Sequence, residues 1–199
     1  MTMPLDAEAE TSDEALLALY ASGNRAAARV LTIRLTPRVL AQALRMLGDR
    51  AEAEDVAQEA MLRLWKIAPE WRDGEALVST WLYRVASNLC IDRLRRRRGV
   101  GLDEVFGDGG EPEDERPGAD QRLLERDRAA ALRAALAELP DRQRQAVVLR
   151  HLEGLSNPQI AAVMDIGVEA VESLTARGKR ALASRLLGRR AELGLSDDT

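Results

Sequence analysis

An acidic, glycine-rich segment at residues 100–121 divides this chain into two halves. It holds five glycines, two prolines and eight acidic side chains against one basic side chain, a net charge of −7. A stretch of this composition cannot bury enough apolar surface to fold by itself. We therefore expect a flexible acidic linker at 100–121 between two small domains, 13–99 and 122–187. A disordered acidic N-terminus (1–12) and a short tail (188–199) complete the chain.

Both halves have the composition of helical proteins. Leu, Ala, Arg and Glu dominate, whereas Phe, Tyr, Ile and Thr, which favour strands, are scarce. The apolar periodicity and its breaks predict eight helices: 13–21, 25–47, 52–67, 77–98, 123–138, 141–152, 157–164 and 168–186. Pro37 should kink or split the second of these. The predicted fold class is all-α, with two small helical domains.

The charge balance permits binding to nucleic acid. The whole chain carries a net charge of −4, but residues 1–99 carry +1 and residues 122–199 carry +2, because the acidity is concentrated in the linker. The sequence contains no apolar run of the roughly 20 residues that a membrane span requires, so we expect no membrane insertion. A single cysteine and the lack of a signal-peptide pattern favour a cytoplasmic location.

The sequence offers little support for catalysis. It has one histidine, His151, and one cysteine, Cys90, which we expect to pack in the core. CxxC and HExxH motifs, a glycine-rich phosphate loop and a Ser/His/Asp set are all missing from the sequence. We therefore predict no catalytic residues, no metal and no cofactor, and a protein that is not an enzyme.

The segment from Thr80 to Arg98 carries the clearest sign of a binding surface. Its periodicity places four apolar residues on one core-facing stripe: Leu82, Val85, Ala86 and Leu89. Four residues suited to unstacked bases share another face: Trp81, Arg84, Asn88 and Arg95. The alternative is an amphipathic helix with solubilising arginines. Four of the six aromatic residues lie close together in sequence and favour the binding interpretation: Trp65, Trp71, Trp81 and Tyr83.

Two further patterns indicate surfaces for partners. In the predicted helix 52–67, a polar stripe with a leucine lies opposite an apolar side: Asp55, Gln58, Glu59 and Leu62. Two interpretations of this stripe stay open: a protein-docking surface and an ordinary solvated face.

Ser156 to Gln159 forms a capping-box pattern before a short helix, a tight turn at 165–167 and a longer helix. This is the pattern of a helix-turn-helix, with a simple helical hairpin as the alternative. Its outer face would carry Ser173, Ala176, Arg177 and Arg180.

Together these motifs resemble a bacterial sigma factor of the extracytoplasmic-function (ECF) group, in the sigma-70 family. The matching segments are AEDVAQEAMLRLW at 53–65, STWLYRVASNLCIDRLRRRR at 79–98 and LPDRQRQAVVLRHLEGLS at 139–156, followed by the helix-turn-helix. The resemblance covers the chain from about Asp13 to Leu186. It implies a sigma-two domain, a linker and a sigma-four domain that bind core RNA polymerase and direct it to promoters.

The resemblance also implies roles for individual residues. The stripe in helix 52–67 would dock on the clamp helices of the largest polymerase subunit: Asp55, Gln58, Glu59 and Leu62. The next segment would open and capture the minus-ten element: Trp71, Trp81, Arg84, Asn88, Arg95 and Arg96. The last helix would read the minus-thirty-five element: Ser173, Arg177, Lys179 and Arg180. An anti-sigma protein that covers the polymerase-binding faces is the expected inhibitor.

The last helix departs from the family pattern at three positions. Glu172 and Leu174 stand where ECF factors commonly carry a basic residue and an arginine, and Gly178 replaces a usual alanine. These changes keep two alternatives open. The chain could be a sigma-like decoy that binds an anti-sigma protein without driving transcription. An ordinary helix-turn-helix repressor would explain the C-terminal half only.

Overall fold

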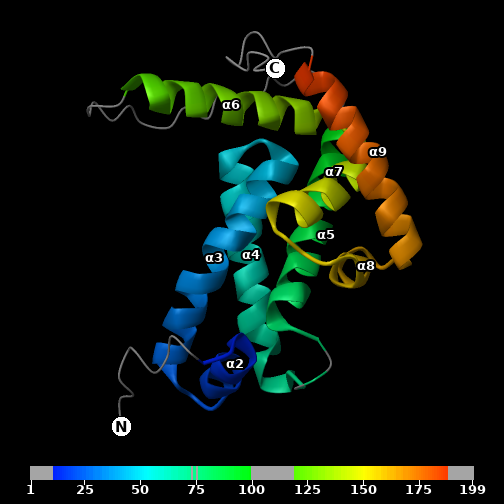
Figure 1. The fold of residues 1–199 in the computed structure, drawn as a ribbon. Coiled ribbons are helices and arrows are strands. Elements are labelled where there is room, and N and C mark those ends of the chain that lie inside the picture. Colours follow the sequence, from blue (N-terminus) through cyan, green and yellow to red (C-terminus); the bar gives the residue numbers. More distant parts are fainter. Residues whose placement is uncertain (1–10, 73, 75, 100–118, 188–199) are drawn as a thin grey trace.

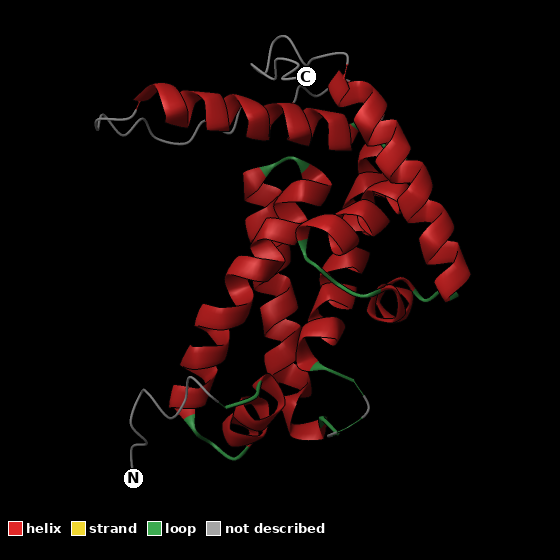
Figure 2. Cartoon of the chain, in the orientation of Figure 1, coloured by secondary structure: helices red, strands yellow, loops and turns green. Residues whose placement is uncertain are grey.

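The computed structural model describes residues 11–72, 74, 76–99 and 119–187 of the 199-residue chain, with the backbone alone at 119–125. Every element of regular structure in these ranges is a helix (Figure 2), which confirms the predicted all-α class. Residues 1–10 of the predicted N-terminal extension, the predicted tail and most of the predicted linker lie outside the described residues. We refer to residues 11–99 as the N-terminal half and 119–187 as the C-terminal half.

The N-terminal half is a bundle of long helices with a short helix across one end (Figure 1). Its elements are α2 (Asp13–Ala21), α3 (Arg25–Leu47), α4 (Arg50–Ile67), the 3₁₀ turn η1 (Ala68–Glu70) and α5 (Val78–Gly99). Each of the first three helices begins after a polar N-cap whose side chain accepts backbone N–H groups: Ser12, Asn24 and Asp49. These caps explain why the predicted starts at 13 and 25 agree with the structure.

Helix α3 continues through Pro37 and is not split there. Proline removes one backbone hydrogen bond from a helix interior and costs about 3 kcal/mol. On either side of it, Leu35 and Val39 are both buried at 1% exposure. Burial of a leucine or valine contributes about 1.5–3 kcal/mol each. Packing against the bundle therefore offsets the cost of the proline, a tertiary effect that local sequence does not reveal.

Small side chains let the three long helices approach one another closely. Ala53 and Ala60 on α4, Ala43 on α3 and Ala86 on α5 are all fully buried. The side chain of Gln42 lies in the same core and spans from α3 to α5. Its Nε2 atom donates to Ser87 Oγ at 2.7 Å and to the Tyr83 carbonyl at 3.3 Å. The core thus fixes the register of α5 against α3.

The C-terminal half contains α6 (Ala119–Ala137), α7 (Asp141–Val147), the π-helical turn η2 (Val148–Leu152), α8 (Asn157–Met164) and α9 (Val168–Leu187). Helix α6 begins at Ala119, inside the range assigned to the linker. The predicted helix 141–152 is α7 continued by the π turn. The capping box of Ser156 and Gln159 is present before α8. Asp165 ends α8 in the left-handed conformation, with φ of 54°, and makes the sharp turn into α9.

The two halves pack directly on each other. Figure 1 shows α8 beside α5, and α7 lies close to both α3 and α5. Four apolar residues of the C-terminal half join the buried cluster formed by the N-terminal helices: Leu136, Leu139, Val147 and Val148. In return, Tyr83 of α5 joins the cluster built by α7, the π turn η2, α8 and α9. The described residues therefore form one continuous packed body.

We expect Gly178→Ala to destabilise the C-terminal half, although alanine favours a helix by about 1 kcal/mol. An added Cβ would lie 2.6 Å from Val147 Cγ2 and 3.0 Å from the carbonyl oxygen of Gln143. Overpacking of this kind costs about 1–3 kcal/mol. Thermal unfolding followed by circular dichroism should show a lower Tm. Gly167→Ala is the matched control, because no atom lies within 4 Å of the position that its added methyl group would occupy.

The same substitution should cost less in a Val147→Ala background, where the clashing methyl group is gone. A Gly178→Ala protein as stable as the wild type would contradict the close packing of α9 on α7.

Candidate protein and nucleic-acid interfaces

The polar stripe predicted on helix 52–67 is an exposed ridge of α4. We call it the α4 ridge: Asp55, Gln58, Glu59 and Leu62. Leu62 is 55% exposed, which is unusual for a large apolar side chain in this fold. The opposite side of the helix is buried as predicted, through Val56, Ala60, Met61 and Leu64. An exposed leucine within a polar rim is the composition expected of a protein-binding surface.

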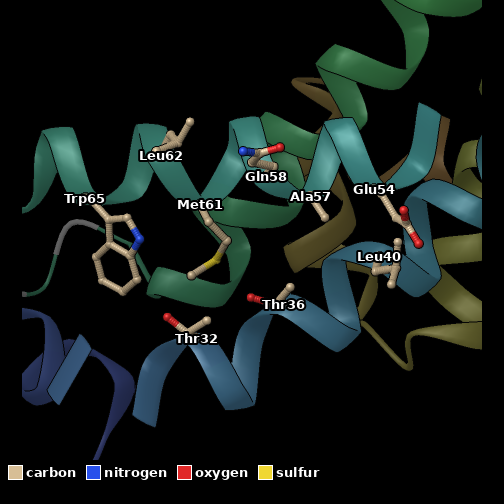
Figure 3. Close-up of a pocket in the computed structure, with 9 residues that line it drawn as sticks. All are labelled: Thr32, Thr36, Leu40, Glu54, Ala57, Gln58, Met61, Leu62 and Trp65. Atoms are coloured by element: carbon tan, nitrogen blue, oxygen red, sulfur yellow. The ribbon is translucent and has the colours of Figure 1, made fainter. Parts of the chain in front are cut away.

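A groove of about 380 Å³ runs between α3 and α4 along one side of this ridge (Figure 3). Its floor and walls come from both helices: Thr32, Thr36, Leu40, Glu54, Ala57, Gln58, Met61, Leu62 and Trp65. In Figure 3 the side chains of Met61 and Thr36 lie between the two helices, while Leu62 and Gln58 stand at the rim. Among the described residues nothing bonds to the buried hydroxyl of Thr36. We refer to this site as the first groove.

Sequence reasoning missed the α3 side of the first groove. Thr32, Thr36 and Leu40 follow an i, i+4, i+8 spacing that could have signalled a shared helix face. Trp65 lies at the end of the groove, where its ring packs on Tyr20 with the centroids 4.8 Å apart. Its indole therefore belongs to this groove and not to a nucleic-acid surface formed with Trp81.

A second groove lies on the other side of the α4 ridge, between α4 and α5. It is lined by Asp55, Gln58, Glu59, Leu62, Arg63, Leu89, Asp92, Arg93 and Arg96. Glu59 pairs with Arg63 at 2.8 Å, and Asp55 pairs with Arg93 at 3.6 Å. The α4 ridge is thus brought together as predicted, and Gln58 and Leu62 line both grooves. Arg96, predicted to contact minus-ten DNA, lies in this second groove beside the ridge.

The four clustered aromatic residues do not form one surface. Trp71 and Trp81 remain together, edge to face, with ring centroids 6.0 Å apart. Trp65 lies in the first groove, and Tyr83 is buried on a different side of α5 from Trp81. Successive residues of a helix are rotated by about 100°, so side chains two positions apart diverge by about 200°. Closeness in sequence therefore brings only Trp71 and Trp81 together in space, and these are the two aromatic residues predicted to act at the minus-ten element.

The predicted minus-ten residues of α5 are accessible. Asn88 and Arg95 are exposed, and Arg84 lies on the same helix with a half-exposed side chain. Trp71 and Trp81 are partly buried against the core of the N-terminal half. Arg84 approaches Asp165 of the helix-turn-helix, with 3.9 Å between Nη2 and Oδ2. We refer to Trp81, Arg84, Asn88 and Arg95 as the α5 face, which combines a partly buried indole, an amide and two cations.

Two ionisable groups of α5 are held neutral inside the protein. Burial raises the pKa of the Cys90 thiol to about 12, and the cysteine is fully buried as predicted. Burial, together with the charge and hydrogen bond of Glu153, raises the pKa of Tyr83 to about 12. The Tyr83 hydroxyl donates to Glu153 Oε2 at 3.2 Å. Sequence reasoning did not single out this contact, because its partners are far apart in the chain.

The predicted minus-thirty-five residues all lie on the exposed surface of α9: Ser173, Arg177, Lys179 and Arg180. Arg177 donates from Nη2 to Ser173 Oγ at 2.7 Å and from Nε to the Ser173 carbonyl at 3.3 Å. Ser173, Arg177 and Arg180 share one face through their i, i+4, i+7 spacing. Lys179 is rotated away from them and lies near His151, whose pKa is lowered by partial burial, Lys179 and Arg150.

The unusual residues of α9 have local structural roles. Leu174 is partly buried against the apolar cluster of α8 and α9, so it stabilises the domain. Glu172 is exposed and accepts a hydrogen bond from Asn157 Nδ2 at 3.3 Å. This contact links the start of α8 to α9. The arrangement leaves the Ser173, Arg177 and Arg180 face open for a ligand.

The described residues show no group of three or more His, Cys, Asp or Glu side chains that could hold a metal ion. None of the helices in the described ranges is long and apolar enough to cross a membrane. The features accessible to partners include the α4 ridge with its two grooves, the α5 face, and the α9 face formed by Ser173, Arg177 and Arg180.

Comparison with known proteins places both halves in one family. The family model for Sigma-70 region 2 matches residues 31–100, and the model for Sigma-70 region 4 matches residues 129–182. ECF RNA polymerase sigma factor SigM from Mycobacterium tuberculosis is 37% identical over 183 residues, which cover 90% of this chain and 86% of SigM.

Two solved structures share the fold. The structure of CnrH in complex with the cytosolic domain of CnrY is 28% identical, with a TM-score of 0.65, and the match covers 89% of this chain and 99% of CnrH. CnrH comes from Cupriavidus metallidurans. The sigma factor RpoE of Bartonella quintana, solved with the anti-sigma factor NepR, is 20% identical with a TM-score of 0.61. That match covers 78% of this chain and 93% of RpoE.

The two family models match the chain in the same order as the sequence motifs, and the second of them includes the helix-turn-helix of α8 and α9. The match to SigM extends over both halves of the chain. The family consists of transcription initiation factors and not of enzymes. This chain belongs to the ECF RNA polymerase sigma factors of the sigma-70 family.

Proposed function

We propose that this chain acts in the cytoplasm as a promoter-specificity subunit that binds core RNA polymerase, opens the minus-ten element and reads the minus-thirty-five element. The observation that carries the proposal is the α4 ridge, where an exposed leucine stands in a polar rim beside the α5 face. An ordinary helix-turn-helix repressor would leave the N-terminal half, and this ridge within it, unexplained. Membership of the ECF family supports the same conclusion.

The α4 ridge and its grooves fit a helical protein partner. Leu62 offers apolar surface to bury, while Asp55 and Glu59 offer carboxylates at the rim. Apolar side chains at the centre of an interface contribute most of its affinity, and charged groups at the rim select the partner. The polymerase clamp helices implied by the family resemblance are partners of this kind.

The α5 face fits an unstacked base next to a phosphate backbone. Asn88 provides an amide that can pair with a base edge, and Arg84 and Arg95 provide positive charge. Extrusion of a base costs a few kcal/mol. Contacts that exist only after extrusion, such as those of Asn88, therefore favour the open promoter over the duplex.

The exposed face of α9 fits the major groove of duplex DNA. In a helix-turn-helix the second helix enters this groove, and arginine pairs well with guanine. The hydrogen bond from Arg177 to Ser173 Oγ holds the guanidinium group against the helix. The joint exposure of Ser173, Arg177 and Arg180 supports promoter reading over the decoy alternative, in which DNA contacts would be dispensable.

The first groove is a second candidate binding site for a protein partner. It is largely apolar and adjoins the α4 ridge, with Gln58 and Leu62 on their shared border. An anti-sigma protein that placed an amphipathic helix in this groove would cover the ridge and exclude the polymerase. CnrH was solved in complex with the cytosolic domain of CnrY, and RpoE in complex with the anti-sigma factor NepR. Both complexes support a protein partner of this kind for this chain.

Combined substitution of Asp55, Gln58 and Glu59 by alanine should weaken binding to core polymerase at least about tenfold, equivalent to 1.4 kcal/mol. Fluorescence anisotropy with labelled protein measures the affinity. A Lys66→Ala, Glu70→Ala protein is the control, because both residues are exposed near the end of α4 and line neither groove. Equal affinity of the triple variant and this control would remove the α4 ridge as the docking surface.

Asn88→Ala should reduce promoter opening and run-off transcription about tenfold while core binding stays nearly unchanged, because a specific base contact contributes roughly 1–3 kcal/mol. Permanganate reactivity of thymines measures the opening. A promoter with a mismatched bubble at the minus-ten element should recover part of the activity. Asn157→Ala makes the same chemical change on α8 and should not impair opening of the minus-ten element. Loss of core binding by Asn88→Ala would contradict its assignment to DNA.

Arg177→Glu should lower the affinity of the holoenzyme for minus-thirty-five duplex at least about tenfold, because it removes a base contact and adds repulsion from phosphate. Electrophoretic mobility shifts at fixed salt provide the measurement. Lys179→Glu changes the net charge equally but on a different side of α9, so it should cost less. If Arg177→Glu and Lys179→Glu lower the affinity for this duplex equally, the effect comes from net charge alone and the groove-facing role of Arg177 is wrong.

A further inference from the structure

Helix α2 lies outside the residues matched by the family model for Sigma-70 region 2, which begin at residue 31. It is nevertheless packed firmly into the bundle. Leu16 and Leu17 are fully buried, and Asp13 pairs with Arg34 of α3 at 3.2 Å. The helix therefore holds a fixed position across one end of the bundle, where it contacts η1 and α5 (Figure 1).

A carboxylate of α2 caps the first turn of α5. Glu14 Oε1 accepts the backbone N–H of Val78, the first residue of α5, at 2.9 Å, although the two residues are 64 positions apart in the chain. Leu77 occupies the N-cap position, since its carbonyl accepts the Trp81 N–H at 3.0 Å. The aliphatic side chain of Leu77 cannot accept a hydrogen bond from the helix. Glu14 therefore supplies, from another helix, the acceptor that the N-cap residue of α5 lacks.

Two physical effects make this cap favourable. The first N–H groups of an α-helix have no partner within the helix, and a buried N–H without an acceptor is costly. Val78 is fully buried, so water cannot take the place of the carboxylate. A negative charge at the start of a helix is also favoured by the helix dipole, and the first turn of α5, from Val78 to Trp81, contains no acidic side chain of its own. Loss of the Glu14 carboxylate would therefore loosen this turn.

The capped turn carries Trp81 of the α5 face. The Trp81 ring meets the Trp71 ring edge to face, with 6.0 Å between the centroids. Trp71 directly follows η1, the other element that α2 contacts. No group within the described ranges bonds to the buried indole nitrogen of Trp71, so packing and not a hydrogen bond of this nitrogen holds its ring. The position of the first turn of α5 therefore determines how the two rings meet.

We propose that Glu14 is a positioning residue for promoter opening: its carboxylate fixes the first turn of α5 and thereby places Trp81, beside Trp71, for contact with the opened minus-ten element. A carboxylate repels the phosphate backbone, and that of Glu14 is bonded to the α5 backbone. Its effect therefore comes through the indole and not from a DNA contact of its own. The role in opening rests on the proposed function of the α5 face, whereas the cap itself does not.

Two substitutions of Glu14 separate the effect of the acceptor from that of the charge. Glu14→Ala removes the acceptor and should reduce promoter opening about tenfold, as measured by permanganate reactivity of thymines in the minus-ten element. Glu14→Gln keeps an oxygen acceptor and loses only the favourable charge, so opening should stay within about twofold of the wild type. Affinity for core polymerase should be unchanged in both variants, because Glu14 lines neither groove beside the α4 ridge.

Asp13→Ala is the matched control. It removes the neighbouring carboxylate of α2 together with its ion pair to Arg34, and it changes the net charge by the same amount, but it leaves the cap on α5 in place. Both alanine variants should lower Tm by about 2–4 °C, because each removes one polar contact of α2. Only Glu14→Ala should impair promoter opening. Equal losses of opening in the two variants would make Glu14 a general stabiliser of α2 and overturn the proposal.

The arrangement of the two rings can be followed without DNA. In a Trp65→Phe background the remaining tryptophans are Trp71 and Trp81, so near-ultraviolet circular dichroism, at wavelengths where only tryptophan absorbs, reports their edge-to-face pair. Glu14→Ala should weaken this signal, whereas Glu14→Gln and Asp13→Ala should keep it, and the far-ultraviolet signal should show that all variants remain helical. An unchanged near-ultraviolet signal in Glu14→Ala would mean that the cap does not place Trp81 and would overturn the proposal.

Combination with Trp81→Ala tests whether Glu14 acts through this ring. Without the indole the cap has no ring to place, so the double variant should open promoters as well as Trp81→Ala alone. A further loss of about tenfold in the double variant would show that the two residues act independently and would overturn the proposal.

The positioning role and the proposed function fail in different ways. A wild type that binds core polymerase but opens no promoter would refute the proposed function and the role of Glu14 in opening, whereas the near-ultraviolet signal would still establish that Glu14 places Trp81. Promoter opening by Glu14→Ala at the level of the wild type would refute the positioning role and leave the proposed function standing.

Discussion

Close packing of α4 against α3 is the contact on which the other surfaces depend. Buried alanines along α4, including Ala53 and Ala60, bring the two backbones together and determine which side of α4 faces outward. Because that side carries Asp55 and Leu62, the same packing creates the α4 ridge and both grooves. The bundle also supports α5, through the buried amide of Gln42. One apolar interface thus positions both the α4 ridge and the α5 face, the surfaces proposed to bind protein and DNA.

The contacts between the halves give the C-terminal half two incompatible roles. Its apolar residues complete the core of the N-terminal half, whereas the proposed reading of a promoter requires its α9 face to reach duplex DNA. Separation of the halves loses apolar burial within the chain and allows contacts with other molecules. The fraction of chains that separate depends on the free-energy difference between the packed and the separated state. A partner that binds both halves at once would stabilise the packed state, and a partner that binds them apart would stabilise the separated state.

Most local structure could be predicted from the sequence. Caps such as Ser12 and the box at Ser156 fixed helix starts, and periodicity identified the buried side of α4 and the exposed Arg177 face of α9. Tertiary effects could not be predicted. Packing kept α3 intact at Pro37, and Tyr83 is buried by residues about 70 positions away in the chain. The roles of the DNA-contacting residues remain predictions, because a free chain shows their exposure and not their ligands.

The π turn η2 has an evolutionary consequence. Its bonds span five residues, as in the contact from the Glu153 amide to the Val148 carbonyl at 3.0 Å, so it holds one residue more than an α-helical turn. Loss of one residue there would rotate every following side chain by about 100° and turn Glu153 away from Arg45. Among relatives, insertions or deletions at this turn should therefore change together with the residues facing it, and sequence length at η2 becomes a marker for ECF factors that share the contacts of Glu153 with Arg45 and Tyr83.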